Sequence, residues 1–349
     1  MPCYSPLKGY RDEETGGIVF KRDNTKAKME VACGQCLGCR LDRSLHWAMR
    51  MVNEAELHEY SGGNSFITLT YRDKDVCDAA QLKAGHHIRD DWCLDAPSLY
   101  PPMAGVSHFQ RFMKRLRKAK CYYPKDHEKA NKLIPGSAIK FYMCGEYGKN
   151  CKHGLDLELV QCPFCNVGRP HYHAILFNCS FPDKREYAVQ NGVTRFTSDI
   201  LQELWPYGFV DVGDVTVNSA GYVARYIMKK VTGDAADQWY ESVDLNGEIT
   251  KCPHEYSTMS NGIGAEWYEK FKDDVFPSDE VPVPGMGVMK GVPRYYEERL
   301  RKEAEADYDM IKARRARYKL DNPEEFESER LWSKYKVKKA QTSDLKRNL

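Results

Sequence analysis

Apolar residues recur at helical spacing in two segments of the chain, residues 41–60 and 107–120. Intervals of three and four place these side chains on one face of a helix, and Ser107 can cap the second segment. The apolar positions are Leu41, Leu45, Ala48, Met49, Val52 and Ala55, followed by Phe109, Phe112, Met113 and Leu116. We therefore expect two helices that each bury one face in a core.

Runs of β-branched and aromatic residues predict strands at 17–20, 64–70, 138–144, 171–177 and 209–217. Thr197 or Ser198 should cap a short helix that Pro206 ends, and Ser219 should cap a helix through Val231. Strands and helices are interspersed without strict alternation. This pattern predicts an α+β fold with a central antiparallel β-sheet and flanking helices.

The segment after residue 233 gives weaker signals. Residues 279–291 are rich in Pro and Gly and predict a linker, whereas residues 294–340 are dense in charge and predict one or two exposed helices interrupted near Pro323. The expected divisions are a Cys-rich N-terminal element (1–40), a main domain (41–233), an accessory segment with the Pro/Gly linker (234–293) and a charged, helical C-terminal region (294–349).

Composition and charge restrict the kind of partner. Hydrophobic residues make up 42% of the 349 residues, enough for a core. We expect a cytosolic protein without a membrane partner, because no apolar run has the length of a membrane span and the N-terminus lacks the features of a signal peptide. The net charge of +2 hides a basic block at residues 108–140, with ten Lys or Arg against two acids. Its candidate DNA-backbone contacts are Arg111, Lys114, Arg115 and Lys118; the alternative is a solvated helix face.

His171 and His173 form the first candidate site. On a strand, residues i and i+2 point to the same face, so both imidazoles project together. If the preceding predicted strand forms a hairpin with this one, Glu146 lies beside them. Two imidazoles and a carboxylate suit Mg²⁺ or Mn²⁺. The alternatives are a structural histidine pair and an exposed acid at a strand end.

Tyr222, Tyr226 and Lys229 form the second candidate site. Their spacing of i, i+4 and i+7 places them on one face of the predicted helix. Tyrosines at this spacing also occur in ordinary packing. The lysine that continues the aromatic face favours a chemical role over simple burial.

Thirteen cysteines are many for a chain that lacks an export signal, and their clustering indicates metal binding in a reducing compartment. Two groups are candidates for structural zinc, and reduced cysteines that pack as small hydrophobic residues are the alternative. The first group is Cys33, Cys36 and Cys39, with Cys3 as a candidate fourth ligand. The second is Cys151, His153, Cys162 and Cys165.

Six segments in collinear order resemble one known family. They are Cys33-Gly-Gln-Cys36-Leu-Gly-Cys39-Arg40, Phe66-Ile-Thr-Leu-Thr70, Cys144-Gly-Glu146-Tyr-Gly148, Arg169-Pro-His171-Tyr-His173, Trp205-Pro-Tyr-Gly208-Phe and Gly221-Tyr222-Val-Ala-Arg-Tyr226. The chain is similar, over roughly residues 1–300, to the HUH endonucleases, and in particular to the replication initiators of microviruses of the gokushovirus type. It departs from that pattern in the polar Tyr172 between the histidines and in an added loop that holds Cys162 and Cys165.

The resemblance implies an RRM-like or ferredoxin-like topology and a metal-dependent strand cleavage. His171, His173 and Glu146 would hold Mg²⁺ or Mn²⁺. A tyrosine, Tyr222 or Tyr226, would attack one DNA strand, form a 5′-phosphotyrosine and leave a 3′-OH primer for rolling-circle synthesis, and the displaced circle would later be rejoined.

The same resemblance implies a role for Lys229 in stabilising the developing charge. The implied partners are single-stranded or locally melted origin DNA and the host helicase and DNA polymerase, in the cytoplasm of a bacterial host.

Two other readings of the sequence remain open at this point. A relaxase or a single-strand transposase of the same superfamily would share the metal site and the tyrosine but recognise other DNA. A non-catalytic, zinc-containing nucleic-acid-binding protein would use the histidines and cysteines for structure alone. Only the enzymes would form a covalent adduct with DNA.

Overall fold

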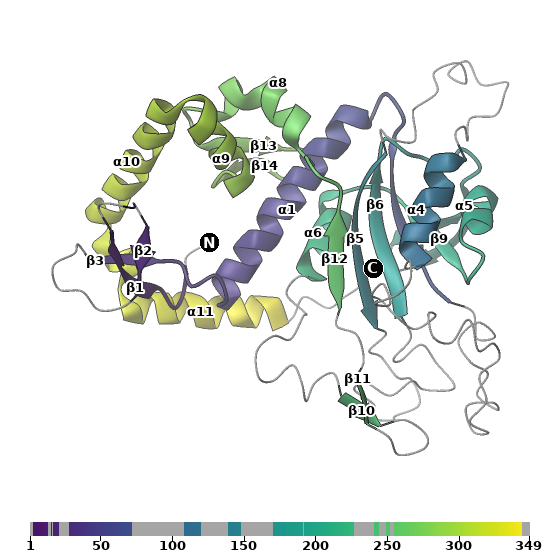
Figure 1. Ribbon diagram of the computed structural model, residues 1–349, viewed down its shortest axis with the longest axis horizontal. Helices are drawn as coiled ribbons and strands as arrows, with labels where there is room; N and C mark the ends of the chain where they lie inside the picture. The colour runs from purple at the N-terminus through teal and green to yellow at the C-terminus, as the bar shows by residue number, and fades with distance from the viewer. Residues whose placement is uncertain are drawn as a thin grey trace. The chain divides into compact units, whose positions relative to one another are not determined.

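The computed structural model describes residues 3–12, 15, 17–20, 28–71, 108–119, 139–147, 170–190, 192–226, 241–243, 249–251 and 255–343. The chain divides into two compact units (Figure 1). The larger unit holds residues 48–272 and 282–288, and the smaller unit holds residues 1–47, 273–281 and 289–348. Helix α1 (Leu37–His58) contributes to both.

The larger unit is built on a seven-stranded antiparallel sheet with the order β12-β5-β6-β4-β9-β8-β7. Its strands are β4 (Asn64–Leu69), β5 (Lys140–Tyr147), β6 (Pro170–Phe177), β7 (Arg185–Gln190), β8 (Val193–Thr197), β9 (Val210–Gly213) and β12 (Tyr256–Met259). The predicted α+β class with a central antiparallel sheet is confirmed.

The centre of this sheet has a ferredoxin-like arrangement. Along the chain this part consists of β4, α4 (His108–Lys118), β5, β6, α5 (Asp199–Leu204) and β9, with the β7–β8 hairpin inserted between β6 and α5. In space the same strands lie in the order β9-β4-β6-β5, so the fourth strand neighbours the first and the third lies between the first and the second. The described residues thus carry the βαββαβ pattern that the family resemblance implied.

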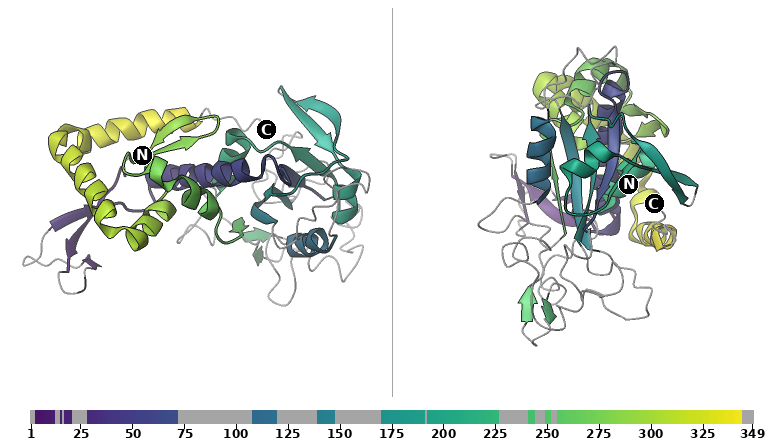
Figure 2. Two further views of the ribbon diagram at one scale, coloured as in Figure 1. Left: turned by 90° about the horizontal axis from the view of Figure 1, so that it is seen from above. Right: turned by 90° about the vertical axis from the view of Figure 1, so that its right-hand side faces the viewer.

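The two faces of the sheet have different contents because side chains alternate along each strand. Tyr172, Ala174 and Leu176 of β6 join the core beneath α4 and α5. His171 and His173 point to the other face, which α6 (Val217–Arg225) covers. Figures 1 and 2 show α4 and α6 on opposite sides of the strands.

The end of β9 and the start of α6 differ from the sequence prediction. The predicted strand at 209–217 ends early, since β9 stops at Gly213, and the predicted cap at Ser219 is wrong by three residues. Thr216 Oγ1 accepts a hydrogen bond from the Ser219 backbone N–H at 3.2 Å, and Ser219 Oγ accepts one from the Thr216 N–H at 2.8 Å. This reciprocal capping box makes Thr216 the N-cap.

A buried carboxylate links α1 to strand β5 of the main sheet. Glu54 Oε1 accepts from Lys140 Nζ at 2.8 Å and lies 3.2 Å from His58 Nε2, and Glu54 Oε2 accepts from the Gly264 N–H at 2.7 Å. Burial alone would raise the pKa of Glu54, but these hydrogen bonds and the Lys140 charge hold it below its ordinary value. The carboxylate therefore stabilises the fold in its charged form.

The smaller unit joins the two ends of the chain. Strands β1 (Leu7–Arg11), β2 (Ile18–Val19) and β3 (Lys28–Val31) form an antiparallel sheet of order β2-β1-β3. The later elements are α9 (Arg294–Glu303), α10 (Glu305–Asp321), the 3₁₀ turn η4 (Pro323–Phe326) and α11 (Ser328–Ser343). The rings of Tyr4 and Tyr335 lie 5.7 Å apart, and Lys319 pairs with Glu30 at 3.1 Å. The predicted helical interruption near Pro323 is confirmed.

Residues 279–291 are not the predicted linker. They form a two-stranded sheet of β13 (Glu280–Val283) and β14 (Gly287–Lys290). Gly285 and Gly287 adopt φ of +76° and +74° in the turn, a conformation that glycine accepts without strain. The glycines that suggested a linker therefore serve a hairpin.

The accessory segment also contributes to the main sheet. Its β12 pairs with β5, and it further contains β10 (Glu241–Val243), β11 (Ile249–Lys251) and α8 (Ala265–Val275). None of the helices in the described parts of the chain combines the length and apolar character needed to span a bilayer.

Candidate metal and tyrosine site

The predicted hairpin brings Glu146 beside the two histidines. In the β5–β6 register Glu146 pairs with His171 and Cys144 pairs with His173. Directly paired residues of neighbouring strands share a face of the sheet. The loop at 148–168 that joins the strands lies outside the described residues.

Three groups meet closely at this position. Glu146 Oε1 lies 2.8 Å from His171 Nε2 and 3.2 Å from His173 Nε2. One ligand atom from each residue can be chosen so that all three lie within 4.8 Å of one another. The side chains of Glu146 and His173 are 6% and 9% exposed, whereas that of His171 is 20% exposed. The cluster is therefore most open on the His171 side.

Two residues of β4 orient His173, and sequence reasoning did not assign them this role. Thr68 pairs with His173 across β4 and β6, and its Oγ1 lies 2.9 Å from His173 Nδ1. The Phe66 ring stacks on the imidazole, with centroids 5.8 Å apart and planes at 10°. Because Thr68 contacts Nδ1, Nε2 is the ring nitrogen that faces the cluster. Metal-binding histidines are commonly oriented in this way by a hydrogen bond at their other ring nitrogen. Both residues belong to the segment Phe66–Thr70, so that motif held the signal.

Helix α6 and its C-cap residue supply the two tyrosines, Tyr222 and Tyr226. One side of the helix is buried through Ala220, Val223 and Ala224. The opposite side carries Tyr222 and faces the histidines. Tyr222 Oη lies 3.4 Å from both Glu146 Oε1 and His173 Nε2. Tyr226 donates a short hydrogen bond to the same Glu146 oxygen. The rings of the two tyrosines are 4.9 Å apart, as expected for an i, i+4 pair.

Four polar groups thus converge on one carboxylate oxygen. Glu146 Oε1 is approached by His171, His173, Tyr222 and Tyr226. A carboxylate oxygen offers two lone pairs, fewer than the groups that point at it. Two imidazole nitrogens and a carboxylate oxygen in this arrangement are a suitable donor set for a divalent cation with open positions. The residues present therefore fit a divalent metal ion.

The electrostatics of the cluster keep Glu146 charged and the tyrosines neutral. Burial would raise the pKa of Glu146, but hydrogen bonds from His171 and His173 hold it well below its ordinary value. Burial and then the charge of Glu146 raise the pKa of Tyr222 and of Tyr226 far above the ordinary value of 10.0. In the free protein both hydroxyls are hydrogen-bond donors at neutral pH.

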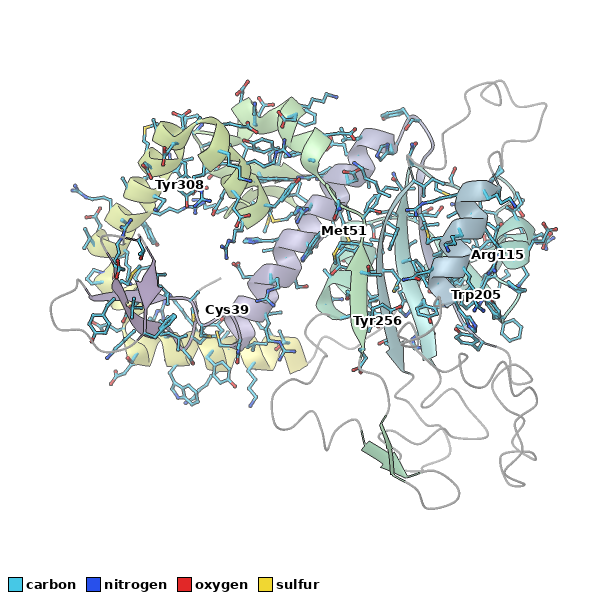
Figure 3. The ribbon with its side chains drawn as sticks, in the orientation of Figure 1. Cys39, Met51, Arg115, Trp205, Tyr256 and Tyr308 are labelled. Atoms are coloured by element: carbon cyan, nitrogen blue, oxygen red, sulfur yellow. The ribbon has the colours of Figure 1, made fainter. Side chains whose placement is uncertain are left out.

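The predicted basic surface of α4 lies on the opposite face of the sheet from this cluster. The apolar stripe Phe109, Phe112, Met113 and Leu116 is buried, as predicted, and Lys114 and Lys118 are exposed. Arg115 Nε donates to the Leu204 carbonyl at 2.8 Å, and its guanidinium lies 5.4 Å from the Tyr207 ring centroid (Figure 3). Arg115 therefore holds α4 to the α5 region. The sheet separates these basic side chains from the tyrosines.

Several predicted site residues lie outside the described residues. They are Lys229, Cys151, His153, Cys162 and Cys165. Their proposed roles stay predictions. The other zinc candidates, Cys33, Cys36 and Cys39, lie together with Cys3 in the smaller unit.

Comparisons with known proteins agree with the resemblance seen in the sequence. A family model described as replication-associated protein ORF2/G2P matches residues 102–231. The chain is 28% identical over 310 residues to replication-associated protein VP4 of Bdellovibrio phage phiMH2K, covering 85% of this chain and 76% of the relative. It is 28% identical over 332 residues to replication-associated protein ORF2 of Spiroplasma virus 4, covering 90% and 86%.

A third relative extends the comparison. The chain is 26% identical over 296 residues to replication-associated protein ORF4 of Chlamydia phage 1, covering 82% of this chain and 58% of the relative. No solved structure matches the chain. The resemblance to the replication proteins of microviruses is confirmed.

Proposed function

We propose that this chain, a relative of the replication-associated proteins of microviruses, is a replication initiator that nicks one strand of origin DNA and joins itself to the new 5′ end. The observation that carries the proposal is the convergence of two tyrosine hydroxyls, from Tyr222 and Tyr226, on the cluster of Glu146, His171 and His173. A nucleophile held beside a cation-binding cluster suits transfer of a phosphoryl group.

The cleavage exchanges one phosphate ester for another. A tyrosine oxygen forms a bond to phosphorus while the bond from phosphorus to the 3′ oxygen breaks. The proton that the tyrosine loses is balanced by the proton that the leaving 3′ oxygen takes up. The products are a 5′-phosphotyrosine and a 3′-OH that a polymerase can extend. Because one ester replaces another, the reverse attack by a 3′-OH can rejoin DNA ends without ATP.

The side chains divide the work of this step. A divalent Mg²⁺ or Mn²⁺ ion held by Glu146, His171 and His173 would polarise the scissile phosphate and offset its charge. Thr68 keeps the His173 ring in its orientation. Lys229, at i+7 from Tyr222, is proposed to stabilise charge that develops on the phosphate or the phenolate. The raised tyrosine pKa values keep both nucleophiles protonated until DNA is in place.

Two tyrosines on one helix suit a reaction with two cleavages. Rolling-circle synthesis needs a second cut while the first tyrosine is still joined to DNA. Tyr226 lies one turn from Tyr222, and both hydroxyls reach the same Glu146 oxygen. The second tyrosine can therefore attack at the same centre, which allows the displaced circle to be released and closed.

The proposed substrate is single-stranded or locally melted origin DNA. A duplex is stiff, whereas a single or locally melted strand can bend to place one phosphate in the cluster. Further proposed partners are the host helicase and DNA polymerase, which would open the duplex and extend the 3′-OH, in the cytoplasm of the bacterial host.

A covalent-adduct assay tests the proposal. Labelled single-stranded oligonucleotides tiled across the genome that encodes the chain are incubated with protein and Mn²⁺ and run on a denaturing gel. A shifted band that survives denaturation and disappears with protease is expected for the wild type. EDTA, His171→Ala and His173→Ala should each abolish it.

The double variant Tyr222→Phe/Tyr226→Phe provides the sharper comparison, because Phe keeps the rings and removes both attacking oxygens. Tyr187→Phe on the exposed part of β7 is the matched control and should leave the band unchanged. A covalent band that persists in the double variant would falsify the assignment of the nucleophiles. Absence of any adduct from the wild type across all oligonucleotides would favour the non-catalytic, nucleic-acid-binding alternative.

A further inference from the structure

Four cysteines from separate parts of the N-terminal sequence meet in the smaller unit. Cys3 precedes β1, Cys33 and Cys36 follow β3, and Cys39 lies in the first turn of α1, where Figure 3 labels it. All four are free thiols and all are partly exposed. Cysteines that serve only as small hydrophobic residues are usually fully buried. Their partial exposure disfavours that explanation.

The sulfur positions match the corners of a tetrahedron. Cys3 and Cys33 are 3.6 Å apart, Cys36 and Cys39 are 3.6 Å apart, and Cys3 and Cys36 are 3.8 Å apart. All four sulfur atoms lie within 4.8 Å of one another. Four sulfurs bound to one zinc at about 2.3 Å would be separated by about 3.8 Å in a regular tetrahedron. The separations are too long for disulfide bonds, in which the sulfurs are about 2.05 Å apart.

Backbone N–H groups point at these sulfurs. Tyr4 N donates to Cys36 Sγ at 3.3 Å, Cys33 N donates to Cys3 Sγ at 3.3 Å, and Cys36 N donates to Cys33 Sγ at 3.2 Å. A neutral thiol is a weak acceptor, whereas a thiolate gains strongly from such donors. The backbone thus presents donors that would stabilise thiolates, which are the form of cysteine that binds a metal.

We propose that Cys3, Cys33, Cys36 and Cys39 bind one structural Zn²⁺ ion. Four thiolates complete the tetrahedral shell and leave no position for water, which is typical of structural zinc. An iron–sulfur cluster also takes four cysteines, but its several metal atoms hold the thiolates further apart than a single ion does. The ion joins the segment before β1 to the start of α1, and so fixes the ends of the small sheet. It is separate from the cluster around Glu146, whose ligands are nitrogen and oxygen.

Elemental analysis of the reduced, full-length protein tests this proposal. The wild type should contain at least about one zinc per chain, by the four-ligand count. Cys36→Ser should lose about one zinc relative to the wild type. Cys179→Ser, a thiol of the larger unit outside the cluster, is the matched control and should lose none. The difference between variants is informative even if other cysteines of the chain bind zinc.

Cobalt substitution reports on the ligands themselves and distinguishes loss of metal from misfolding. Co²⁺ in place of zinc should give the visible and thiolate charge-transfer absorption of a tetrahedral sulfur site. Cys3→Ser should weaken the charge-transfer band, whereas Cys3→His should restore a full complement of metal with a shifted spectrum. Unchanged zinc content in both Cys36→Ser and Cys3→Ser, or iron in place of zinc in the wild type, would overturn the proposal.

Discussion

The carboxylate of Glu146 stays ionised only because two imidazoles surround it. Its burial favours the neutral acid, and the hydrogen bonds from His171 and His173 reverse that preference. The same negative charge opposes ionisation of Tyr222 and Tyr226. Both tyrosine hydroxyls therefore stay protonated in the free protein, and a cation bound at Glu146 would remove one of the causes of their raised pKa.

Thr68→Val should weaken metal binding without unfolding the protein. Valine keeps the shape of threonine but removes the oxygen 2.9 Å from His173 Nδ1, so the imidazole loses the group that fixes its orientation. We expect the apparent Mn²⁺ affinity for adduct formation to fall about 10- to 100-fold. Thr194→Val on β8 is the control. Identical Mn²⁺ titrations for Thr68→Val and the wild type would contradict this role for Thr68.

Each single tyrosine variant should retain some cleavage. In Tyr222→Phe the hydroxyl of Tyr226 still reaches Glu146, and the converse holds for Tyr226→Phe. Short oligonucleotides should therefore still form adducts with either variant, while repeated rounds on a circular template should fail with both. One inert variant beside one that completes repeated rounds would instead indicate a mechanism with a single tyrosine.

The sequence alone predicts that His171, His173 and Glu146 lie together. It does not predict the groups that orient His173. His171 and His173 share a face because side chains alternate along a strand. The hairpin of β5 and β6 then places Glu146 beside His171. Thr68 reaches His173 through pairing between β4 and β6, which are separated by about a hundred residues in sequence. No local pattern encodes that register, so this contact required the fold.

At the scale of elements, α6 depends on its N-cap. Thr216→Ala removes the side-chain acceptor of the Ser219 N–H and half of the capping box. The expected loss of stability is about 1 kcal/mol, which lowers the thermal midpoint by roughly 2–4 °C in a domain of this size. Asn218→Ala at an exposed position of the same turn is the control. Equal midpoints for the two variants would contradict the capping assignment.

The hydrogen-bonded carboxylate of Glu54 makes the stability of the larger unit depend on pH. Because the folded pKa of Glu54 is depressed, its contribution is complete above the ordinary carboxyl pKa of 4.5 and is lost as the pH falls below that value through the lower folded pKa. Glu54→Gln should cost about 3 kcal/mol at pH 7, since Lys140 then lacks its buried partner.

Urea unfolding at pH 7 and below pH 4 measures this effect. The difference between Glu54→Gln and the wild type should shrink at the lower pH, because the wild-type carboxyl is then becoming neutral. Glu59→Gln, an exposed change in the adjacent turn, should have little effect at either pH. A difference between Glu54→Gln and the wild type that stays constant with pH would argue against a charged Glu54.

Elements with a clear period were predictable, and elements defined by their partners were not. The apolar stripe of α4 and the run of aromatic and aliphatic residues in β6 identified both elements from the sequence. Strand β12 has four residues that are all half-buried, so it shows no alternation, and its pairing with β5 alone makes it a strand. The hairpin of β13 and β14 was mistaken for a linker because turn glycines and linker glycines are alike in sequence.

At the scale of the whole molecule, the candidate site belongs entirely to the larger unit. Glu146, the histidines and both tyrosines lie within residues 48–272. A fragment of residues 48–288 should therefore fold with a cooperative transition and form the covalent adduct. Circular dichroism and the gel assay check this. A folded fragment without adduct formation would show that the smaller unit is needed for the reaction.

The two faces of the main sheet would place α4 and the tyrosines on different parts of a DNA strand that bound both. Lys114 and Lys118 are exposed on α4, and α4 covers the face of the sheet opposite α6 (Figure 2). If α4 binds DNA, the Lys114→Ala/Lys118→Ala variant should weaken binding of long single strands and reduce its salt dependence. Cleavage of a short oligonucleotide at saturation should be unchanged. If the variant lost only cleavage of short oligonucleotides, the basic side chains would instead contact DNA at the cleavage site.

The smaller unit is assembled from segments that leave the ribosome at very different times. About 240 residues separate the end of its first segment at Trp47 from the start of its last at Met289. At usual rates of translation, roughly 10 to 50 seconds pass between their appearance. The sheet of β1, β2 and β3 must wait through this interval for α10 and α11, while the larger unit can fold. All four cysteines lie within the first 39 residues and are therefore synthesised early. A metal ion bound to them would hold the folded N-terminal sheet together until α10 and α11 are synthesised.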